Sequence, residues 1–205
     1  MVDQTAAREA PAAGRNREPL LAILRQVLPV DGTVLEIGSG TGQHAAWFAP
    51  ELSPRRWLPT DPAESALASI AAWSALGEEP RPLSPRALDA SLDNWPVGKR
   101  DQITAVFSAN VVHISPWAVT EGLVSGAGRV LQTGGKMIFY GPFKRNGKHT
   151  AEGNVRFDKW LQDQDSRWGV RSLERISELA LEQGFLMPEL HDMPANNFCV
   201  SFAKS

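Results

Sequence analysis

The fold follows from the stretch Val34-Leu35-Glu36-Ile37-Gly38-Ser39-Gly40-Thr41-Gly42, in which a short apolar run reaches an acidic residue and glycine then stands at every second position. The segment after it, residues 43–49, is helix-prone. A strand, a glycine turn and a helix in this order let a ligand approach the backbone closely and meet the positive end of the helix. The stretch therefore predicts a ligand-binding turn in an α/β fold; the alternative is a glycine turn with a purely structural role.

The glycine spacing separates two kinds of nucleotide-binding turn. A dinucleotide-binding turn reads Gly-x-Gly-x-x-Gly, which would place a third glycine at position 43, where this chain has Gln43. An NAD-binding oxidoreductase is therefore disfavoured. The pattern Glu-x-Gly-x-Gly-x-Gly instead resembles the S-adenosylmethionine loop of class I methyltransferases.

Composition is that of a single enzyme-sized domain. The 205 residues are 42% hydrophobic, which is enough for one core, so we expect one domain over residues 1–205. Residues 1–14 are polar and rich in alanine, and we expect them to form a flexible arm. They contain no apolar targeting segment, and no long apolar run occurs elsewhere, so we expect a cytoplasmic protein without a membrane partner.

Charge and cysteine content narrow the function further. With 21 basic and 23 acidic side chains the net charge is -2, which disfavours a nucleic-acid partner. Cys199 is the only cysteine, and the four histidines are scattered, so we expect no disulfide and no metal site. These features leave a small molecule or a protein side chain as the substrate, and they predict no particular oligomeric state.

Strand-like and helix-like segments alternate along the chain. We expect helices at 19–28, 43–48, 63–75, 117–131 and 172–183, and strands at 33–37, 56–60, 87–88, 102–108, 136–140, 189–192 and 197–203. Strands separated by helix-length segments pair in parallel. We therefore predict a doubly wound, Rossmann-like sheet of seven strands with helices on both faces, in which only the last strand is antiparallel.

Polar residues end the first four strands, where a parallel sheet binds its ligand. Glu36 and the glycines end the first strand. Asp61 ends the second, about 20 residues further on, where an acid can accept hydrogen bonds from both ribose hydroxyls; its alternative role is to cap a helix. Asp89 ends the third and is implied by the resemblance to bind the adenine amino group, unless it is an ordinary loop aspartate. Asn110 ends the fourth and would face the methionine part of the cofactor.

Five motifs extend the resemblance over residues 10–202. They are Arg15-Asn16-Arg17-Glu18-Pro19, Glu36-Ile37-Gly38-Ser39-Gly40-Thr41-Gly42-Gln43-His44, Ser108-Ala109-Asn110-Val111-Val112-His113-Ile114, Tyr140-Gly141-Pro142-Phe143-Lys144 and Met193-Pro194-Ala195-Asn196-Asn197. Together they resemble the methyltransferase-like 26 family, which implies a class I methyltransferase fold with S-adenosyl-L-methionine as cofactor and S-adenosyl-L-homocysteine as product. The family has no established substrate. The cofactor-binding residues expected here are Arg15, Asn16, Glu36, Gly38, Gly40, Gly42, Asp61, Asp89 and Asn110.

Arg15 and Asn16 carry a further expectation. They precede the first expected helix in a polar segment, so we predict that they fold over the bound cofactor as a lid and exclude water. The alternative is a helix-capping Asn16 and a solvent-facing Arg15.

The substrate side is expected to be built from the loops after the later strands. His113 is a candidate general base because histidine titrates near neutral pH, although it could equally pack beside Trp117 or cap a helix. Tyr140 is a second catalytic candidate. The loop that follows it carries Lys144 and His149, which could hold an anionic or planar substrate or could be solvated. Asn196 and Asn197 could bind substrate or simply form a turn.

Absent motifs restrict the chemistry. The fourth strand ends in Ser108-Ala109-Asn110-Val111, unlike the Asn/Asp-Pro-Pro-aromatic motif of nucleic-acid amine methyltransferases. A cysteine nucleophile is disfavoured because Cys199 lies inside an expected strand. The sequence thus predicts S-adenosylmethionine-dependent methyl transfer to a small molecule or a protein side chain. The alternative is a non-catalytic module that binds the cofactor or its product.

Overall fold

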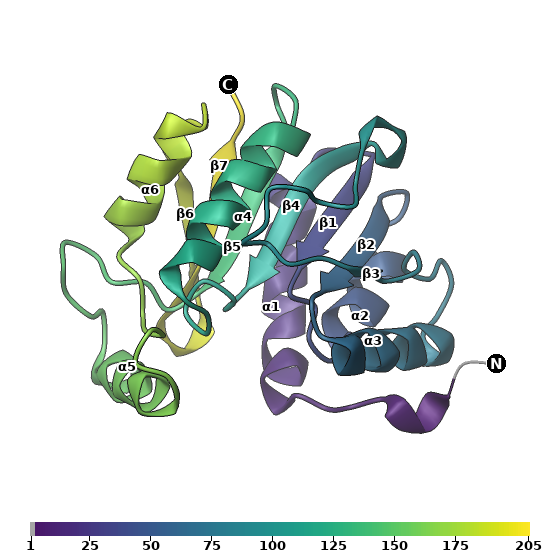
Figure 1. Ribbon diagram of the computed structural model, residues 1–205, viewed down its shortest axis with the longest axis horizontal. Helices are drawn as coiled ribbons and strands as arrows, with labels where there is room; N and C mark the ends of the chain where they lie inside the picture. Colours follow the sequence, from purple (N-terminus) through teal and green to yellow (C-terminus); the bar gives the residue numbers. More distant parts are fainter. Residues whose placement is uncertain (1–2) are drawn as a thin grey trace.

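Seven strands form one sheet in the order β3-β2-β1-β4-β5-β7-β6 in a computed structural model that describes residues 3–205 (Figure 1). The strands are β1 (Thr33–Ile37), β2 (Arg56–Asp61), β3 (Arg86–Ala87), β4 (Ile103–Ala109), β5 (Lys136–Gly141), β6 (Glu189–Met193) and β7 (Asn197–Ala203). Pairings among β1 to β5 are parallel, and β7 runs antiparallel to both β5 and β6. The predicted fold class is confirmed, with β3 displaced by one residue.

The helices are α1 (Pro11–Val27), α2 (Gln43–Glu51), α3 (Glu64–Leu76), α4 (Trp117–Val130), α5 (Glu152–Gln164) and α6 (Leu173–Glu182). Two of them differ from expectation. Helix α1 starts eight residues before Pro19, and α5 was not expected at all. Short 3-10 turns occur at Gln4–Ala6, Lys99–Asp101 and Pro194–Asn196.

Helix α1 begins at Pro11 because a proline in the first turn lacks only an N–H that would have no helical partner there. The helix then continues through Pro19, which removes one internal hydrogen bond. Ala13 is buried on the same helix as Leu20 and Leu24, so packing of this face against the body of the protein compensates for the proline. A proline that the sequence suggests as a helix start is thus an interior residue.

Residues 3–14 do not form the flexible arm expected from composition. The backbone N–H of Arg8 donates to Ser69 Oγ on α3 (2.9 Å), and Trp73 Nε1 donates to the Arg8 carbonyl (2.7 Å). The N–H of Ala10 donates to Gln43 Oε1 at the start of α2 (2.6 Å), and residues 11–14 are helical. This segment therefore lies along α3 beside the glycine turn. Residues 1 and 2 of the expected arm lie outside the described residues.

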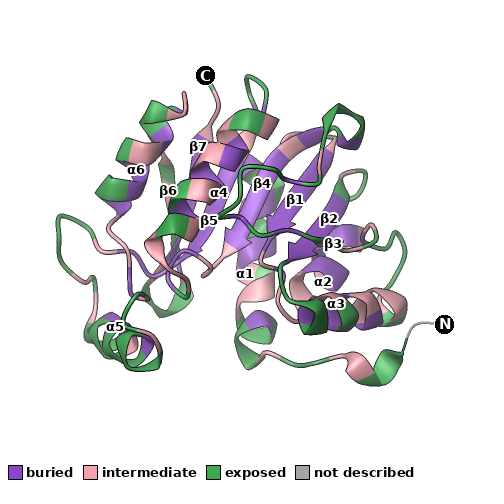
Figure 2. Cartoon of the chain, in the orientation of Figure 1, coloured by how far each residue is buried: buried purple, intermediate pink, exposed green. Residues whose placement is uncertain are grey.

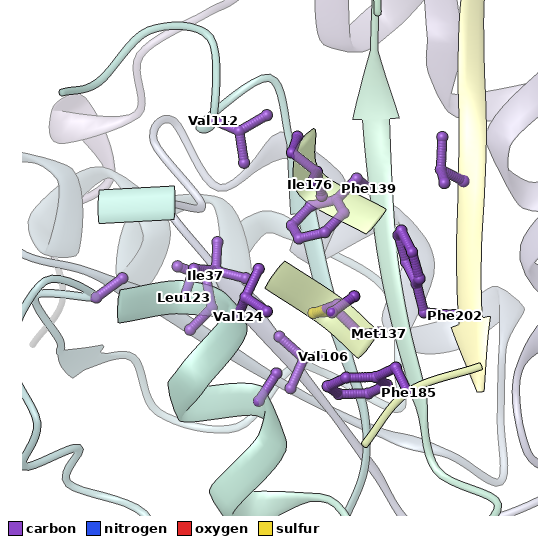
Figure 3. Close-up of a cluster of buried hydrophobic side chains, with 14 of the residues drawn as sticks. Ile37, Val106, Val112, Leu123, Val124, Met137, Phe139, Ile176, Phe185 and Phe202 are labelled. Carbon is purple, nitrogen blue, oxygen red and sulfur yellow. The ribbon is translucent and has the colours of Figure 1, made fainter. Parts of the chain in front are cut away.

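Two hydrophobic clusters fill the space on the two faces of the sheet. One cluster joins strand residues to α4 and α6, with Val106 and Phe139 facing Leu123 and Ile176 (Figure 3). The other joins the opposite face to α1 and α2. The strands β1, β2, β4, β5 and β7 are buried almost throughout, the edge strands β3 and β6 are more exposed, and the helices bury one side each (Figure 2). Successive strand residues alternate between the two clusters, which is why Tyr140 faces α1 and α2 whereas Phe139 faces α4 and α6.

Helix α5 lies beyond the sheet, at the lower left of Figure 1. Its buried residues are Asn154, Asp158 and Leu161, two of which are polar. Hydrophobic periodicity could not reveal a helix whose buried side is held mainly by polar contacts. No helix within residues 3–205 combines the length and apolar character needed to cross a membrane.

Candidate functional site

The three glycines of the turn differ in what surrounds them. Gly38, Gly40 and Gly42 all have positive φ values, of 70°, 57° and 89°. A Cβ on Gly42 would lie 2.6 Å from the Cα of Ile70, and one on Gly38 would meet the Val111 side chain. A Cβ on Gly40 would meet nothing within 4 Å. Gly38 and Gly42 are therefore needed for packing, whereas Gly40 borders open space that a ligand can occupy.

Helix α2 starts directly at this turn. Gly42 is its N-cap residue, and no side chain caps the helix. The N-terminal end of α2 therefore keeps backbone N–H groups for a ligand, and its dipole favours a negatively charged one. The turn is anchored from the neighbouring strand, because the Ser39 N–H donates to the Thr60 carbonyl (2.9 Å).

Asp61 lies at the end of β2, where the sequence predicts an acid. Its Oδ2 accepts a hydrogen bond from the Gly40 N–H, and its Oδ1 accepts one from the Ala63 N–H, both at 3.0 Å. Asp61 therefore joins the glycine turn to the start of α3. Each carboxylate oxygen accepts more than one hydrogen bond, so this structural role leaves acceptor capacity for a ligand.

Glu36 lies beneath the turn and is 2% exposed. Its Oε2 accepts hydrogen bonds from Trp57 Nε1 (2.9 Å) and Ser39 Oγ (2.8 Å). Burial raises the pKa of Glu36 to about 7, and the nearby charge of Asp61 acts in the same direction. This carboxyl group therefore changes charge close to neutral pH directly below the glycine turn.

Asp89 and Asn110 lie after the third and fourth strands, as expected. Asp89 is exposed, and its Oδ1 accepts hydrogen bonds from the N–H (2.9 Å) and Oγ (2.7 Å) of Ser91. This is the geometry of the loop-aspartate alternative. Asn110 has a φ of 62°, which is uncommon outside glycine, and its N–H donates to the Tyr140 carbonyl (2.8 Å). Such backbone strain is often found at functional sites.

His113 does not have the surroundings of a general base. It is fully buried, and burial lowers its pKa to about 3. Its Nδ1 accepts a hydrogen bond from the Arg171 N–H (3.2 Å), and its ring packs against Phe143 with the centroids 4.7 Å apart. A Cβ on Gly141 would lie 2.5 Å from His113 Nε2. A side chain with no exposed surface cannot reach a methyl acceptor in this conformation. These surroundings match the buried alternative, with Phe143 in place of Trp117 as the neighbour of the ring.

Tyr140 is the residue before the last of β5 and lies within a group of polar side chains. Asn197 Nδ2 donates to the Tyr140 hydroxyl oxygen (3.0 Å), and the Asn16 amide also forms a hydrogen bond with it. Asn16 Oδ1 lies 2.7 Å from Nε2 of His44. Burial raises the pKa of Tyr140, while the two amides and the charge of Arg15 oppose that rise. Residues of α1 and β7 thus meet at the phenol of β5, and α2 holds the α1 residue in place through His44.

Arg15 and Asn16 belong to α1 and do not precede it. The predicted lid, which required a mobile segment before the first helix, is therefore wrong in its geometry. Asn16 is held by His44, and Arg15 is exposed beside Tyr140. Both residues nevertheless lie at the same edge of the sheet as the end of β5 and the start of β7.

Lys144 and His149 do not present free charge to a substrate. Lys144 Nζ lies 2.8 Å and His149 Nε2 lies 3.0 Å from Oδ2 of Asp158 on α5. Oδ1 of Asp158 accepts a hydrogen bond from the Val170 N–H (2.7 Å). Both predicted substrate-binding residues instead help to attach α5, so the solvated alternative is also wrong for them.

The two turn asparagines have different roles. Asn196 is exposed with a φ of 57°, and its carbonyl accepts a hydrogen bond from Asn154 Nδ2 (3.1 Å). Asn197 instead directs its side chain to Tyr140. The turn interpretation therefore fits Asn196, while Asn197 joins the polar group at β5.

Sequence reasoning missed two residues of this edge. His44 was visible only as part of a motif, and nothing in the sequence indicated that it would meet Asn16 from another helix. Asp158 lay in a segment without a predicted element. Cys199 agrees with the sequence expectation, because it is buried in β7 and burial raises its pKa to about 12, which disfavours a thiolate nucleophile.

Three surface hollows are lined by residues that do not belong to the candidate site. A hollow of about 690 Å³ lies beside Trp95 and Arg129, one of about 330 Å³ beside Leu181 and Met187, and one of about 250 Å³ beside Trp47. Neither Gly40 nor Asp61 lines any of them. The candidate site is therefore defined by strand ends, backbone conformation and polar contacts.

The arrangement of strands and turn defines the class I methyltransferase fold, and solved structures support this assignment. The chain is similar to the S-adenosylmethionine-dependent methyltransferase SibL in its apo form (TM-score 0.74, 18% identity, 94% of this chain and 55% of that chain). It is also similar to an O-methyltransferase family protein from Burkholderia thailandensis (TM-score 0.75, 12% identity, 95% of this chain and 58% of that chain). A third similar structure is magnesium protoporphyrin IX methyltransferase from Synechocystis PCC 6803 with bound S-adenosylhomocysteine (TM-score 0.66, 13% identity, 92% of this chain and 82% of that chain). At these identities the likeness establishes the fold, and the chain spans little more than half of the first two proteins.

Residues 7–204 match the family described as "Protein of unknown function (DUF938)". The chain belongs to this family. The match covers nearly the whole sequence, including the glycine turn and the polar group at Tyr140.

Proposed function

We propose that this protein binds S-adenosylmethionine at the carboxyl edge of its sheet and transfers the methyl group to a small molecule or a protein side chain. The observation that carries the proposal is the open space at Gly40, the one glycine of the turn that no packing contact requires. An uncapped helix start beside it and an acid at the end of β2 fit the cofactor's polar groups. The resemblance of five sequence motifs to the methyltransferase-like 26 family also supports it.

Different residues would bind different parts of the cofactor. The turn at Gly38, Gly40 and Gly42 would hold the methionine part, with Asn110 beside it. Asp61 would accept hydrogen bonds from the ribose hydroxyls, and the free Oδ2 of Asp89 would serve the adenine amino group. Glu36 would support the turn from below and place negative charge near a cationic ligand.

When bound, S-adenosylmethionine supplies an electrophilic methyl carbon on a sulfonium sulfur. The residues of this chain would then align the acceptor in line with that carbon and exclude water. Tyr140 is the side chain best placed to touch the acceptor, because it lies near the carboxyl end of β5 next to Asn110. Lys144, His149 and Asn196 would act indirectly, by holding α5 and the final turn at the edge of the site.

Transfer of labelled methyl from S-adenosylmethionine into a cell extract tests this function. The wild-type protein should label an acceptor, and the Gly40→Val variant should not. Loss of labelling in the variant excludes a contaminating methyltransferase. Equal labelling by both proteins would contradict the proposal.

A second candidate is a module that binds the cofactor or its product without catalysis. The buried state of His113 favours it, because that histidine cannot remove a proton from an acceptor. Binding of S-adenosylhomocysteine together with no labelled acceptor in any extract would favour this reading.

A further inference from the structure

The Tyr140 hydroxyl accepts hydrogen bonds from its neighbours and donates none to the residues that the structure describes. A phenol oxygen accepts through its lone pairs and donates a single proton. Asn197 Nδ2 donates to this oxygen at 3.0 Å, and the Asn16 amide forms the second hydrogen bond. Within residues 3–205 no group accepts the hydroxyl proton. The phenol can therefore donate a hydrogen bond to a ligand.

The orientation of Asn16 is fixed by His44. Burial lowers the pKa of His44 to about 4, so its imidazole is neutral at physiological pH. The atom of Asn16 that lies 2.7 Å from His44 Nε2 is Oδ1, which can only accept, so Nε2 carries the proton. The Asn16 amide nitrogen is then free to donate to Tyr140. Stacking of His44 on Phe48, with ring centroids 5.2 Å apart, holds the imidazole in place.

A positive charge lies close enough to this donor to lower the pKa of Tyr140. Arg15 is exposed on α1, and its charge acts on Tyr140. The Arg15 guanidinium forms no ion pair or side-chain hydrogen bond with any residue from 3 to 205. A hydroxyl donor beside an unpaired guanidinium has the donor-only chemistry that carboxylates require.

We propose that Tyr140 and Arg15 form a carboxylate-binding site, with Asn16 and Asn197 as positioning residues. The inference rests on the proposed function for the source of the carboxylate, which is either the methionine part of the cofactor or the methyl acceptor. In both cases Tyr140 donates its hydroxyl proton to a carboxylate oxygen and Arg15 pairs with the charge.

Tyr140 is the only tyrosine of the chain, so it can be observed directly. Protein labelled with ¹³C at tyrosine Cζ gives a single resonance for this residue. Benzoate should shift that resonance in a saturable manner, and benzamide, a neutral molecule of nearly the same shape, should not. No response to benzoate or to S-adenosylhomocysteine would overturn the site.

Two nucleosides distinguish the two sources. If the carboxylate belongs to the cofactor, S-adenosylhomocysteine should shift the resonance and prevent the benzoate response, while 5′-methylthioadenosine, which lacks the carboxylate, should do neither. If it belongs to the acceptor, the benzoate response should persist with S-adenosylhomocysteine bound. Equal shifts with both nucleosides and none with benzoate would overturn the site.

Calorimetry with S-adenosylhomocysteine keeps this proposal separate from the proposed function. Binding without any tyrosine response would remove the carboxylate site and leave the function intact. A benzoate response without nucleoside binding would support the site and contradict the function.

Variants test each partner against a matched control. Arg15→Gln and Tyr140→Phe should each weaken carboxylate binding by about ten-fold or more, because each removes a charge-assisted contact. Arg25→Gln lies on the same helix about 15 Å away and should leave binding unchanged. Asn197→Ala should weaken binding and also raise the pKa of Tyr140, which a merely structural role would not require. Full binding by both Arg15→Gln and Tyr140→Phe would contradict the proposal.

Discussion

Three glycines that look equivalent in the sequence have different roles at the residue scale. Gly38 and Gly42 allow Val111 and Ile70 to approach the backbone closely, whereas Gly40 faces open space. A motif alone cannot make this distinction, because it depends on which side chains from later segments reach each position. Substitutions of Gly40, Asp61 and Glu36 test these roles.

Gly40→Val should abolish detectable binding of S-adenosylhomocysteine, because its side chain would fill the ligand space. Gly134→Val is the matched control. Gly134 also has a positive φ, of 85°, and open space around it, but it follows α4, away from the turn. Both variants should lose comparable stability through backbone strain, and calorimetry should find binding only in the control. Equal affinities would show that the open space at Gly40 is not used.

Asp61→Ala should weaken S-adenosylhomocysteine binding by roughly ten- to a hundred-fold, since charge-assisted hydrogen bonds to the ribose hydroxyls are lost. It should also reduce the free energy of unfolding by about 1–2 kcal/mol, because two backbone N–H groups lose their acceptor. Asp89→Ala, an exposed loop change, should affect stability much less. An unchanged affinity in folded Asp61→Ala would exclude Asp61 from the ribose site.

Glu36 should make stability depend on pH. Its pKa is about 7 in the folded protein and 4.5 for an unperturbed glutamate. Between these two pH values the folded state therefore binds a proton that the unfolded state does not. The stabilisation is complete below about pH 4.5 and is lost as the pH rises through 7. It corresponds to about 3 kcal/mol.

Glu36→Gln cannot titrate, so wild-type stability relative to this variant should fall by about that amount between pH 4.5 and 8. Urea unfolding across this range measures the difference. The exposed Glu18→Gln variant should instead follow the wild-type profile. Parallel profiles for wild type and Glu36→Gln would contradict the assignment.

At the scale of elements, the strands and most helices could be predicted because their burial follows the periodicity of their apolar residues. Helix α5 could not, because Asp158 and Asn154 provide much of its buried side. The start of α1 was missed because Pro19 reads as a first-turn residue, although the packing of the residues before it continues the helix. The site followed the same division. Asp61 and Asn110 lie at the ends of β2 and β4, as the order of strands predicts. His113, Lys144 and His149 instead contact residues from distant segments, and the sequence alone does not indicate those contacts.

Asp158→Asn should loosen α5. The side chain loses its charge opposite Lys144 and His149, and breaking such a buried pair costs about 3 kcal/mol. Hydrogen exchange should quicken over residues 142–164, while the core strands remain protected. Asp163→Asn lies on the same helix but is exposed, and it should leave exchange unchanged. Equal exchange in the two variants would mean that α5 is held by other contacts.

At the scale of the whole molecule, residues from five strands and the starts of α1 and α2 meet at one edge of the sheet. The fold brings together Gly40 and Asp61 on one side of that edge and Tyr140 with Asn197 on the other. A ligand that bridges them should stabilise the native state as a unit. At a concentration 100 times its Kd, it would add about 2.7 kcal/mol.

We propose that this edge binds S-adenosylmethionine and its product. Calorimetric titration of the wild-type protein with S-adenosylhomocysteine tests it most directly, with NAD as the comparison ligand. We expect saturable binding of one S-adenosylhomocysteine per chain and no binding of NAD. No heat of binding with S-adenosylhomocysteine, or saturable binding of NAD in its place, would contradict it.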